Sequence, residues 1–137
     1  MSQPHVFTFA ATLGAFAEAF PRLRQLLADW KIDTGPAYRC QLVFEEVSVN
    51  IVKHAYRDER PHEILLTVAR EPDAIVLRFE DDGIPFDPTR RPVVQSPAPP
   101  ESSIGGRGLL LVGRMAHSLH YERTPQSTNR LTVRIAA

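Results

Sequence analysis

The spacing of apolar side chains divides the first half of the chain into one strand and two helices. Residues 5–11 alternate between apolar and polar positions, which predicts a strand. Apolar residues recur at helical spacing over 13–30, which predicts a helix that Pro21 must either kink or begin in its main part. A glycine–proline pair then marks a break. The second helix is expected from Pro36 to about Tyr56, because proline is tolerated in the first turn.

The second half of the chain predicts four more strands, one short helix and one long loop. The strands are expected at 64–70, 74–82, 118–122 and 130–135, and the helix at 108–115. Residues 84–104 are rich in proline and show little periodicity, which is typical of a long functional loop. This order of elements predicts an α+β fold: a two-layer α/β sandwich, with a mixed, mostly antiparallel sheet and the helices on one face.

Composition restricts the classes of protein that need to be considered. A chain of 137 residues fits a single domain over 1–137. The 16 basic and 16 acidic residues give a net charge of zero, which offers no support for direct binding of nucleic acid or of a membrane surface. Cys40 is the one cysteine and cannot form an intrachain disulfide, which fits a reducing compartment. No stretch is apolar and long enough to span a bilayer, so we expect a cytoplasmic protein.

The middle of the second predicted helix carries a carboxylate and a carboxamide on one face. Glu46 and Asn50 lie one turn apart, and Lys53 and His54 continue the same edge. Asn50 could offer an oxygen to Mg²⁺, which prefers oxygen ligands, and Glu46 could orient or deprotonate a hydroxyl group. His54 fits a structural role better than that of a phosphoacceptor, because nothing positions a second base beside it. The pattern also fits the polar edge of an ordinary amphipathic helix.

A second candidate site lies at the end of the strand predicted for 74–82. Counting by twos places Asp81 on the same face as Leu77 and Phe79, which is the face expected to be buried. A buried carboxylate needs a hydrogen-bond donor, and the exocyclic amino group of adenine is one such donor. Gly83 would allow the backbone to approach a flat ligand closely. The alternative is a plain β-turn, since Asp, Gly and Pro are ordinary turn residues.

A third candidate site precedes the short predicted helix. Gly105, Gly106 and Gly108 would leave backbone N–H groups exposed at the positive end of that helix, where phosphate groups bind readily. Arg107 could add a charged contact to a phosphate. A flexible glycine linker ahead of a core helix would have the same sequence, so this motif is weak when taken alone.

Together, and in this order, the three motifs resemble those of the GHKL ATPase superfamily. Glu46 and Asn50 resemble its N box, residues 81–85 its first glycine box, and residues 106–109 its second. The amino-acid sequences of residues 44–56 and 81–88 are most similar to those of the anti-sigma-factor serine/threonine kinases. The resemblance implies an ATP-binding α/β sandwich with a mobile lid at about 84–107.

The resemblance also implies roles for individual residues. ATP and Mg²⁺ would be the cofactors, with Glu46 as the catalytic carboxylate, Asn50 as the metal ligand and Asp81 as the acceptor for adenine. The glycines would let the backbone pass close to the nucleotide, whereas a phosphate contact by Arg107 is our own hypothesis. The nucleotide-binding residues that we expect are Asn50, Lys53, His54, Asp81, Gly83, Pro85, Gly105, Gly106, Arg107, Gly108 and Leu109.

The implied function is that of an anti-sigma regulatory factor in a partner-switching pathway. Such a protein binds a sigma factor, phosphorylates an antagonist protein on serine or threonine, and forms a homodimer. Pro85 stands where the first glycine box commonly has a second glycine, and proline makes a hinge stiffer. That departure allows an alternative: a non-catalytic, nucleotide-gated module that sequesters a partner. A detached histidine-kinase catalytic domain fits less well, because the sequence shows no helix pair with a phosphoacceptor histidine.

Overall fold

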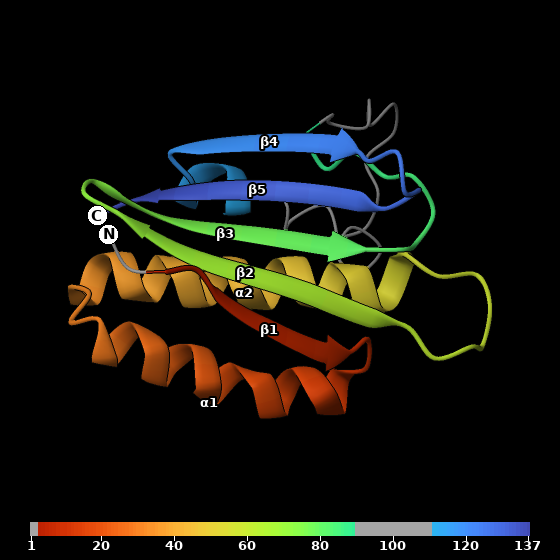
Figure 1. The fold of residues 1–137 in the computed structure, drawn as a ribbon, viewed down its shortest axis with the longest axis horizontal. Coiled ribbons are helices and arrows are strands. Elements are labelled where there is room, and N and C mark those ends of the chain that lie inside the picture. The colour runs from red at the N-terminus through yellow and green to blue at the C-terminus, as the bar shows by residue number, and fades with distance from the viewer. Residues whose placement is uncertain (1–2, 90–110) are drawn as a thin grey trace, which may run out of the picture.

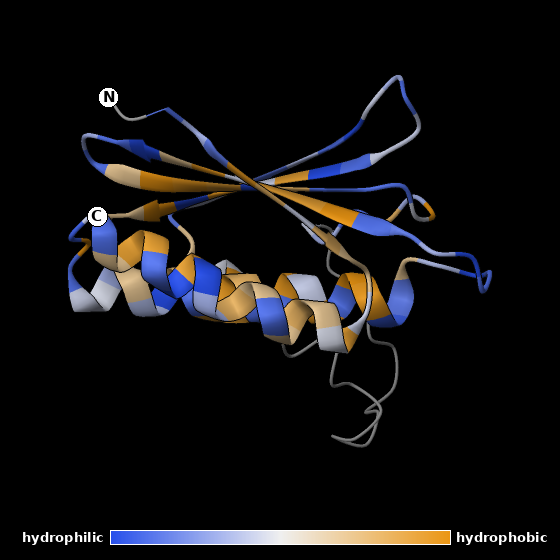
Figure 2. Ribbon diagram, turned by 60° about the horizontal axis from the view of Figure 1, so that its bottom comes forward, coloured by the Kyte–Doolittle hydropathy of each residue, from blue (hydrophilic) through white to orange (hydrophobic). Residues whose placement is uncertain are grey.

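The computed structural model describes residues 3–89 and 111–137, which form a sheet of five strands with helices packed on one face (Figure 1). Seen from the side, the helices lie beneath the twisted sheet and the apolar surfaces of the two layers face each other (Figure 2). The elements in chain order are β1 (His5–Ala10), α1 (Leu13–Asp29), α2 (Thr34–His54), β2 (Glu63–Glu71), β3 (Ala74–Asp81), β4 (Ser118–Arg123) and β5 (Asn129–Ala136). Residues 111–115 are also helical. The predicted two-layer α+β architecture is confirmed.

The strands pair in the order β1-β2-β3-β5-β4. Every strand pair in the described part of the chain is antiparallel, so the sheet is purely antiparallel there and not mixed as predicted. Short turns account for the pairing of β2 with β3 and of β4 with β5, because a tight turn can join only antiparallel neighbours. Pro72 and Asp73 form such a turn between β2 and β3. Since β5 pairs with both β3 and β4, the ends of these three strands lie side by side.

Each helix is defined by local sequence features. The Thr12 side chain caps α1, accepting a hydrogen bond from the backbone N–H of Ala15 at 3.0 Å. Pro21 lies inside α1, and the helix continues through it although proline removes one backbone donor. Lys31 then adopts a left-handed conformation with φ 57°, which reverses the chain toward α2. The predicted boundaries of both helices agree with the observed ones to within two residues.

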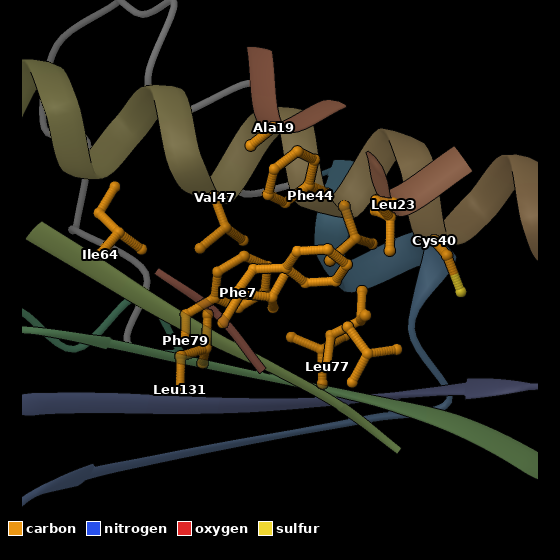
Figure 3. Close-up of a cluster of buried hydrophobic side chains, with 14 of the residues drawn as sticks. Phe7, Ala19, Leu23, Cys40, Phe44, Val47, Ile64, Leu77, Phe79 and Leu131 are labelled. Atoms are coloured by element: carbon orange, nitrogen blue, oxygen red, sulfur yellow. The ribbon is translucent and has the colours of Figure 1, made fainter. Parts of the chain in front are cut away.

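The core fills the space between the sheet and the helices. Phe44 of α2 makes ring contacts with Phe9, Phe16, Phe20 and Phe79. Figure 3 shows Phe44 among the buried side chains that lie between α2 and the sheet. Inward-facing residues of β1, β2, β3 and β5 complete the core, including Phe7, Ile64, Leu66, Val68, Ile75, Leu77, Leu131, Val133 and Ile135. This packing fixes α2 across the sheet, with its last turn beside the end of β3 (Figure 1).

The predicted lid at about 84–107 falls only partly within the described residues. Residues 84–89 are described and follow the end of β3, while residues 90–107 lie outside the described part of the chain. The single-domain assignment of 1–137 stays a prediction. Among the described residues, no helix is long and apolar enough to cross a membrane.

Candidate functional site

A pocket opens between the C-terminal half of α2 and the neighbouring ends of β3, β4 and β5. Its polar lining comes from Asn50, His54, Asp81, Tyr121 and Asn129. The remaining lining is apolar: Val47, Ile51, Ala55, Phe79, Phe86, Pro88 and Leu131. Apolar walls with a few convergent polar groups are the usual form of a site for a small, flat molecule.

Asp81 is a buried residue of the pocket lining, and its strand register predicts that it is buried. The residue is 7 % exposed, and its Oδ1 accepts hydrogen bonds from the backbone N–H of Gly83 at 2.9 Å and from Nδ2 of Asn129 at 3.0 Å. Burial raises the pKa of Asp81, while these two hydrogen bonds act in the opposite direction. No described residue donates to Oδ2. One carboxylate oxygen is therefore left for a donor on a ligand.

Gly83 packs against the end of α2. A Cβ atom at this position would lie 2.5 Å from the carbonyl oxygen of Ala55 and 2.8 Å from Oδ1 of Asp81. The same carbonyl accepts a hydrogen bond from the backbone N–H of Ile84 at 2.8 Å. The structure therefore gives a reason for the glycine that the sequence did not suggest: close approach to α2. Its predicted approach to a nucleotide stays a prediction.

Asn129 is a buried residue of the pocket that the sequence analysis missed. It stands opposite Asp81 in the pairing of β3 with β5, and Tyr121 and Arg123 on β4 also donate hydrogen bonds to its side-chain oxygen. Arg123 donates in addition to the carbonyl oxygen of Gly83 at 2.8 Å. A signal was present, because the alternation of Leu131 with its neighbours places Asn129 on the inward face of its strand.

The four polar residues predicted on α2 do not all reach the pocket. Asn50 and His54 line it, one helical turn apart. Glu46 and Lys53 are absent from its lining within the described part of the chain. Glu46 is half-buried; desolvation and the neighbouring Glu45 raise its pKa, and Lys53 opposes this shift. Along α2, Glu46 lies one turn before Asn50 and Lys53 lies about one turn after it.

Only the first of the two predicted glycine boxes lies within the described residues. Pro85 is exposed and does not line the pocket, whereas Phe86 and Pro88, two described residues of the predicted lid, do. Gly105, Gly106, Arg107, Gly108 and Leu109 lie outside the described residues. Their proposed contacts with phosphate groups therefore stay predictions, as do the roles of the other predicted site residues.

The described residues contain no group of three or more His, Cys, Asp or Glu side chains that could hold a metal ion. Asn50 is the predicted metal ligand that does line the pocket, and its amide oxygen is a hard donor. This donor set does not fit a metal cage built from protein alone. It does fit Mg²⁺ held mainly by the phosphate oxygens of a ligand and by water.

Several solved structures have a fold similar to that of this chain. A structure of the RsbU and RsbW domains of Rv1364c from Mycobacterium tuberculosis matches with a TM-score of 0.69 and 16% identity, covering 99% of this chain and 33% of that one. The SiaB-SiaC complex from Pseudomonas aeruginosa matches with a TM-score of 0.59 and 18% identity, over 97% of this chain and 89% of that one. The histidine kinase AdeS of Acinetobacter baumannii matches with a TM-score of 0.50 and 11% identity, over 98% and 68%.

These likenesses establish the fold, and the chain spans about a third of the length of the first of the three. Comparison with curated proteins gives no match. The family described as the histidine kinase-like ATPase domain matches residues 9–135, which is nearly the whole chain and includes both sides of the pocket. The chain therefore belongs to the histidine kinase-like ATPase domain family.

Proposed function

We propose that this protein binds ATP in the pocket between α2 and β3 and acts as an anti-sigma regulatory factor. The observation that carries the proposal is the buried carboxylate of Asp81 in the lining of a largely apolar pocket, with Oδ2 receiving no hydrogen bond from a described residue. The amino group of adenine would donate to Oδ2, while its ring would lie between the apolar walls. Membership of an ATPase family supports a nucleotide as the ligand.

The phosphate groups of ATP would extend from this pocket along α2 past Asn50. The amide oxygen of Asn50 would contribute one ligand to Mg²⁺, and His54 would line the same wall. When bound, Mg²⁺ supplies positive charge that offsets charge on the phosphate groups. Backbone N–H groups of residues 105–108, together with Arg107, would bind the phosphates, and Lys53 would add positive charge at this end.

We further propose that the protein is a serine/threonine kinase. Glu46 would accept the proton of a serine or threonine hydroxyl on an antagonist protein, the hydroxyl oxygen would bond to the γ-phosphorus, and ADP would leave. Desolvation raises the pKa of Glu46, which makes its carboxylate a stronger base than an exposed one. Most of the rate enhancement would come from positioning and from electrostatic stabilisation.

The proposed role in a partner-switching pathway is supported by solved structures of similar fold. One contains an RsbW domain and another a SiaB-SiaC complex, which support a role in partner switching. The partners that we propose are a sigma factor and an antagonist of the anti-sigma factor. A homodimer and a cytoplasmic location belong to the same proposal.

A non-catalytic, nucleotide-gated binding module is the alternative. The position of Glu46 favours it, because this carboxylate does not line the described pocket and would have to act beyond it. Pro85 also favours the binding module, since a stiff lid hinge hinders turnover more than it hinders nucleotide binding. Such a module would bind ATP and a partner without phosphorylating it.

Two measurements test these proposals. Calorimetric titration with ATP and Mg²⁺ should show binding, and Asp81→Asn should weaken it by about tenfold or more because a charged acceptor is lost. Asp73→Asn, in the exposed turn between β2 and β3, is the matched control and should bind normally. Unchanged affinity in Asp81→Asn would exclude Asp81 from the site.

The second measurement separates the kinase from the module. Labelled ATP is incubated with the protein and with candidate antagonist proteins. Label on a serine or threonine that disappears with Glu46→Ala supports the kinase. Tight ATP binding without transfer to any candidate supports the module.

A further inference from the structure

We propose that Asn129 is a positioning residue for the adenine end of the pocket, where it fixes which oxygen of Asp81 faces the base. This inference rests on the proposed ATP-binding function and adds to it the origin of base selectivity. Asn129 belongs to none of the three sequence motifs. It reaches the site because β5 is inserted between β3 and β4 in the sheet.

The pairing of β3 with β5 places Asn129 directly opposite Asp81. Asn129 is 6 % exposed, so its carboxamide must find its partners within the protein. Its Nδ2 donates to Oδ1 of Asp81 at 3.0 Å and to the carbonyl oxygen of Ile84 at 2.8 Å. Both protons of the amide group are therefore used.

The orientation of this carboxamide is determined by its surroundings. On the other side, Oδ1 of Asn129 accepts from the hydroxyl of Tyr121, from Nη1 of Arg123 at 3.2 Å and from the backbone N–H of Phe86 at 3.3 Å. Rotating the amide by half a turn would place its oxygen against two acceptors and its nitrogen against two groups that can only donate, Nη1 of Arg123 and the backbone N–H of Phe86. The hydrogen bonds thus permit one orientation only.

Two consequences follow for the ligand. Oδ1 of Asp81 is occupied by Asn129 and by the N–H of Gly83, so Oδ2 is the oxygen that is left to receive a donor from the base. The same carboxamide also ties down Ile84 and Phe86, and Phe86 lines the pocket. One side chain therefore orders both the acceptor and the adjacent rim.

Loss of this side chain should change selectivity more than folding. The side-chain amide group of Asn129 donates to Asp81 and stabilises its charged form, whereas burial favours the neutral form. Without that donor, Asp81 would take up a proton more easily and could also turn about its side-chain bonds. A protonated carboxyl can donate to the carbonyl group that inosine carries in place of the amino group of adenine.

The test compares the dissociation constants of ATP and inosine triphosphate. The triphosphate and sugar contributions cancel in their ratio, and so does any loss of folded protein. Wild-type protein should prefer ATP, and Asn129→Ala should reduce this preference by about tenfold, the effect of losing one charge-assisted hydrogen bond. Thr132→Ala, on the same strand but facing the opposite side of the sheet, is the matched control and should keep the wild-type ratio.

The outcomes distinguish the inference from the function beneath it. Wild-type protein that binds neither nucleotide overturns the proposed function. Wild-type protein that prefers ATP, together with a folded Asn129→Ala variant of equal preference, overturns the role of Asn129 alone. If Asn129→Ala does not fold, Tyr121→Phe gives the test, because it removes one donor that orients the carboxamide. Its ratio should fall in the same direction, and an unchanged ratio overturns the inference.

Discussion

Gly83 and Ala55 lie so close together that a side chain on Gly83 would have no space. A Cβ atom there would be 2.5 Å from the carbonyl oxygen of Ala55 and 2.6 Å from its Cβ. The N–H of Ile84 donates to that same carbonyl at 2.8 Å. This contact joins the last turn of α2 to the segment after β3, and so it holds the two walls of the pocket together.

Gly83→Ala should therefore destabilise the protein. Backbone atoms must shift to admit the new methyl group, and such overpacking costs about 1–3 kcal/mol. The free energy of unfolding in urea measures this. Gly14→Ala is the control, since a Cβ atom on Gly14 meets nothing within 4 Å and alanine suits a helix. Equal stability of the two variants would contradict the close approach.

Local sequence patterns predicted most of the fold. Alternation and helical spacing gave each strand and both long helices to within about two residues, because each of these elements buries one continuous apolar face. Strand alternation also placed Asp81 on the inward face, where the structure shows it buried. Pro21 was the one ambiguous feature of α1, since tertiary packing decides whether a helix continues through proline.

The pairing of distant strands explains what the sequence did not reveal. The contact of Asn129 with Asp81 can be predicted only once β5 is known to pair with β3. The sequence of neither strand specifies that neighbour by itself. The same holds for Arg123, which reaches Gly83 from β4. The pocket thus combines one residue predicted from register, Asp81, with hydrogen-bond partners that depend on strand order.

A second group of interacting side chains lies beside the pocket, around His62. Its Nδ1 is 3.0 Å from Asp82 and its Nε2 is 2.6 Å from Asp58. The imidazole ring stacks on Tyr56 with centroids 3.9 Å apart. Because both nitrogens face carboxylates, the protonated ring satisfies both contacts. These hydrogen bonds join the segment after α2 to the end of β3.

Stability should therefore depend on pH through His62. The hydrogen bond with Asp58 raises the pKa of His62 above its ordinary 6.5, and Asp82 adds to this shift. A raised pKa means that the stabilisation is fully present below pH 6.5 and is lost as pH rises through the folded value. The pKa of Asp58 is lowered from 3.8, so its contribution is lost in acid below that value.

Thermal unfolding measured from pH 6.5 upward checks the first of these effects. His62→Phe is the informative variant, because it keeps an aromatic ring on Tyr56 and removes both nitrogens. Its melting temperature should change less with pH than that of the wild type. An identical slope in the two proteins would show that His62 does not couple folding to protons.

Ser48 should be replaceable by alanine without loss of stability. Its hydroxyl is buried at 0 % exposure in α2 and has no hydrogen-bond partner among the described residues. Removing an unsatisfied buried hydroxyl should leave the free energy of unfolding unchanged or raise it by up to about 1 kcal/mol. Thr12→Ala is the contrasting control, because its hydroxyl caps α1 and its loss should cost about 1 kcal/mol. A larger loss in Ser48→Ala than in Thr12→Ala would reveal a partner for Ser48.

Cys40 should be chemically inert in the folded protein. The side chain is fully buried in α2, and burial raises the pKa of its thiol to about 12, against a smaller effect of Arg39. Because the thiolate is the reactive form, modification by a thiol reagent should require unfolding or local opening. Adding Ser118→Cys provides an exposed thiol at the start of β4 as an internal standard. In native buffer the thiol reagent should modify the new cysteine quickly, and it should modify Cys40 only as denaturant is added. Equally fast modification of both thiols in native buffer would mean that the packing of α2 against the sheet opens readily.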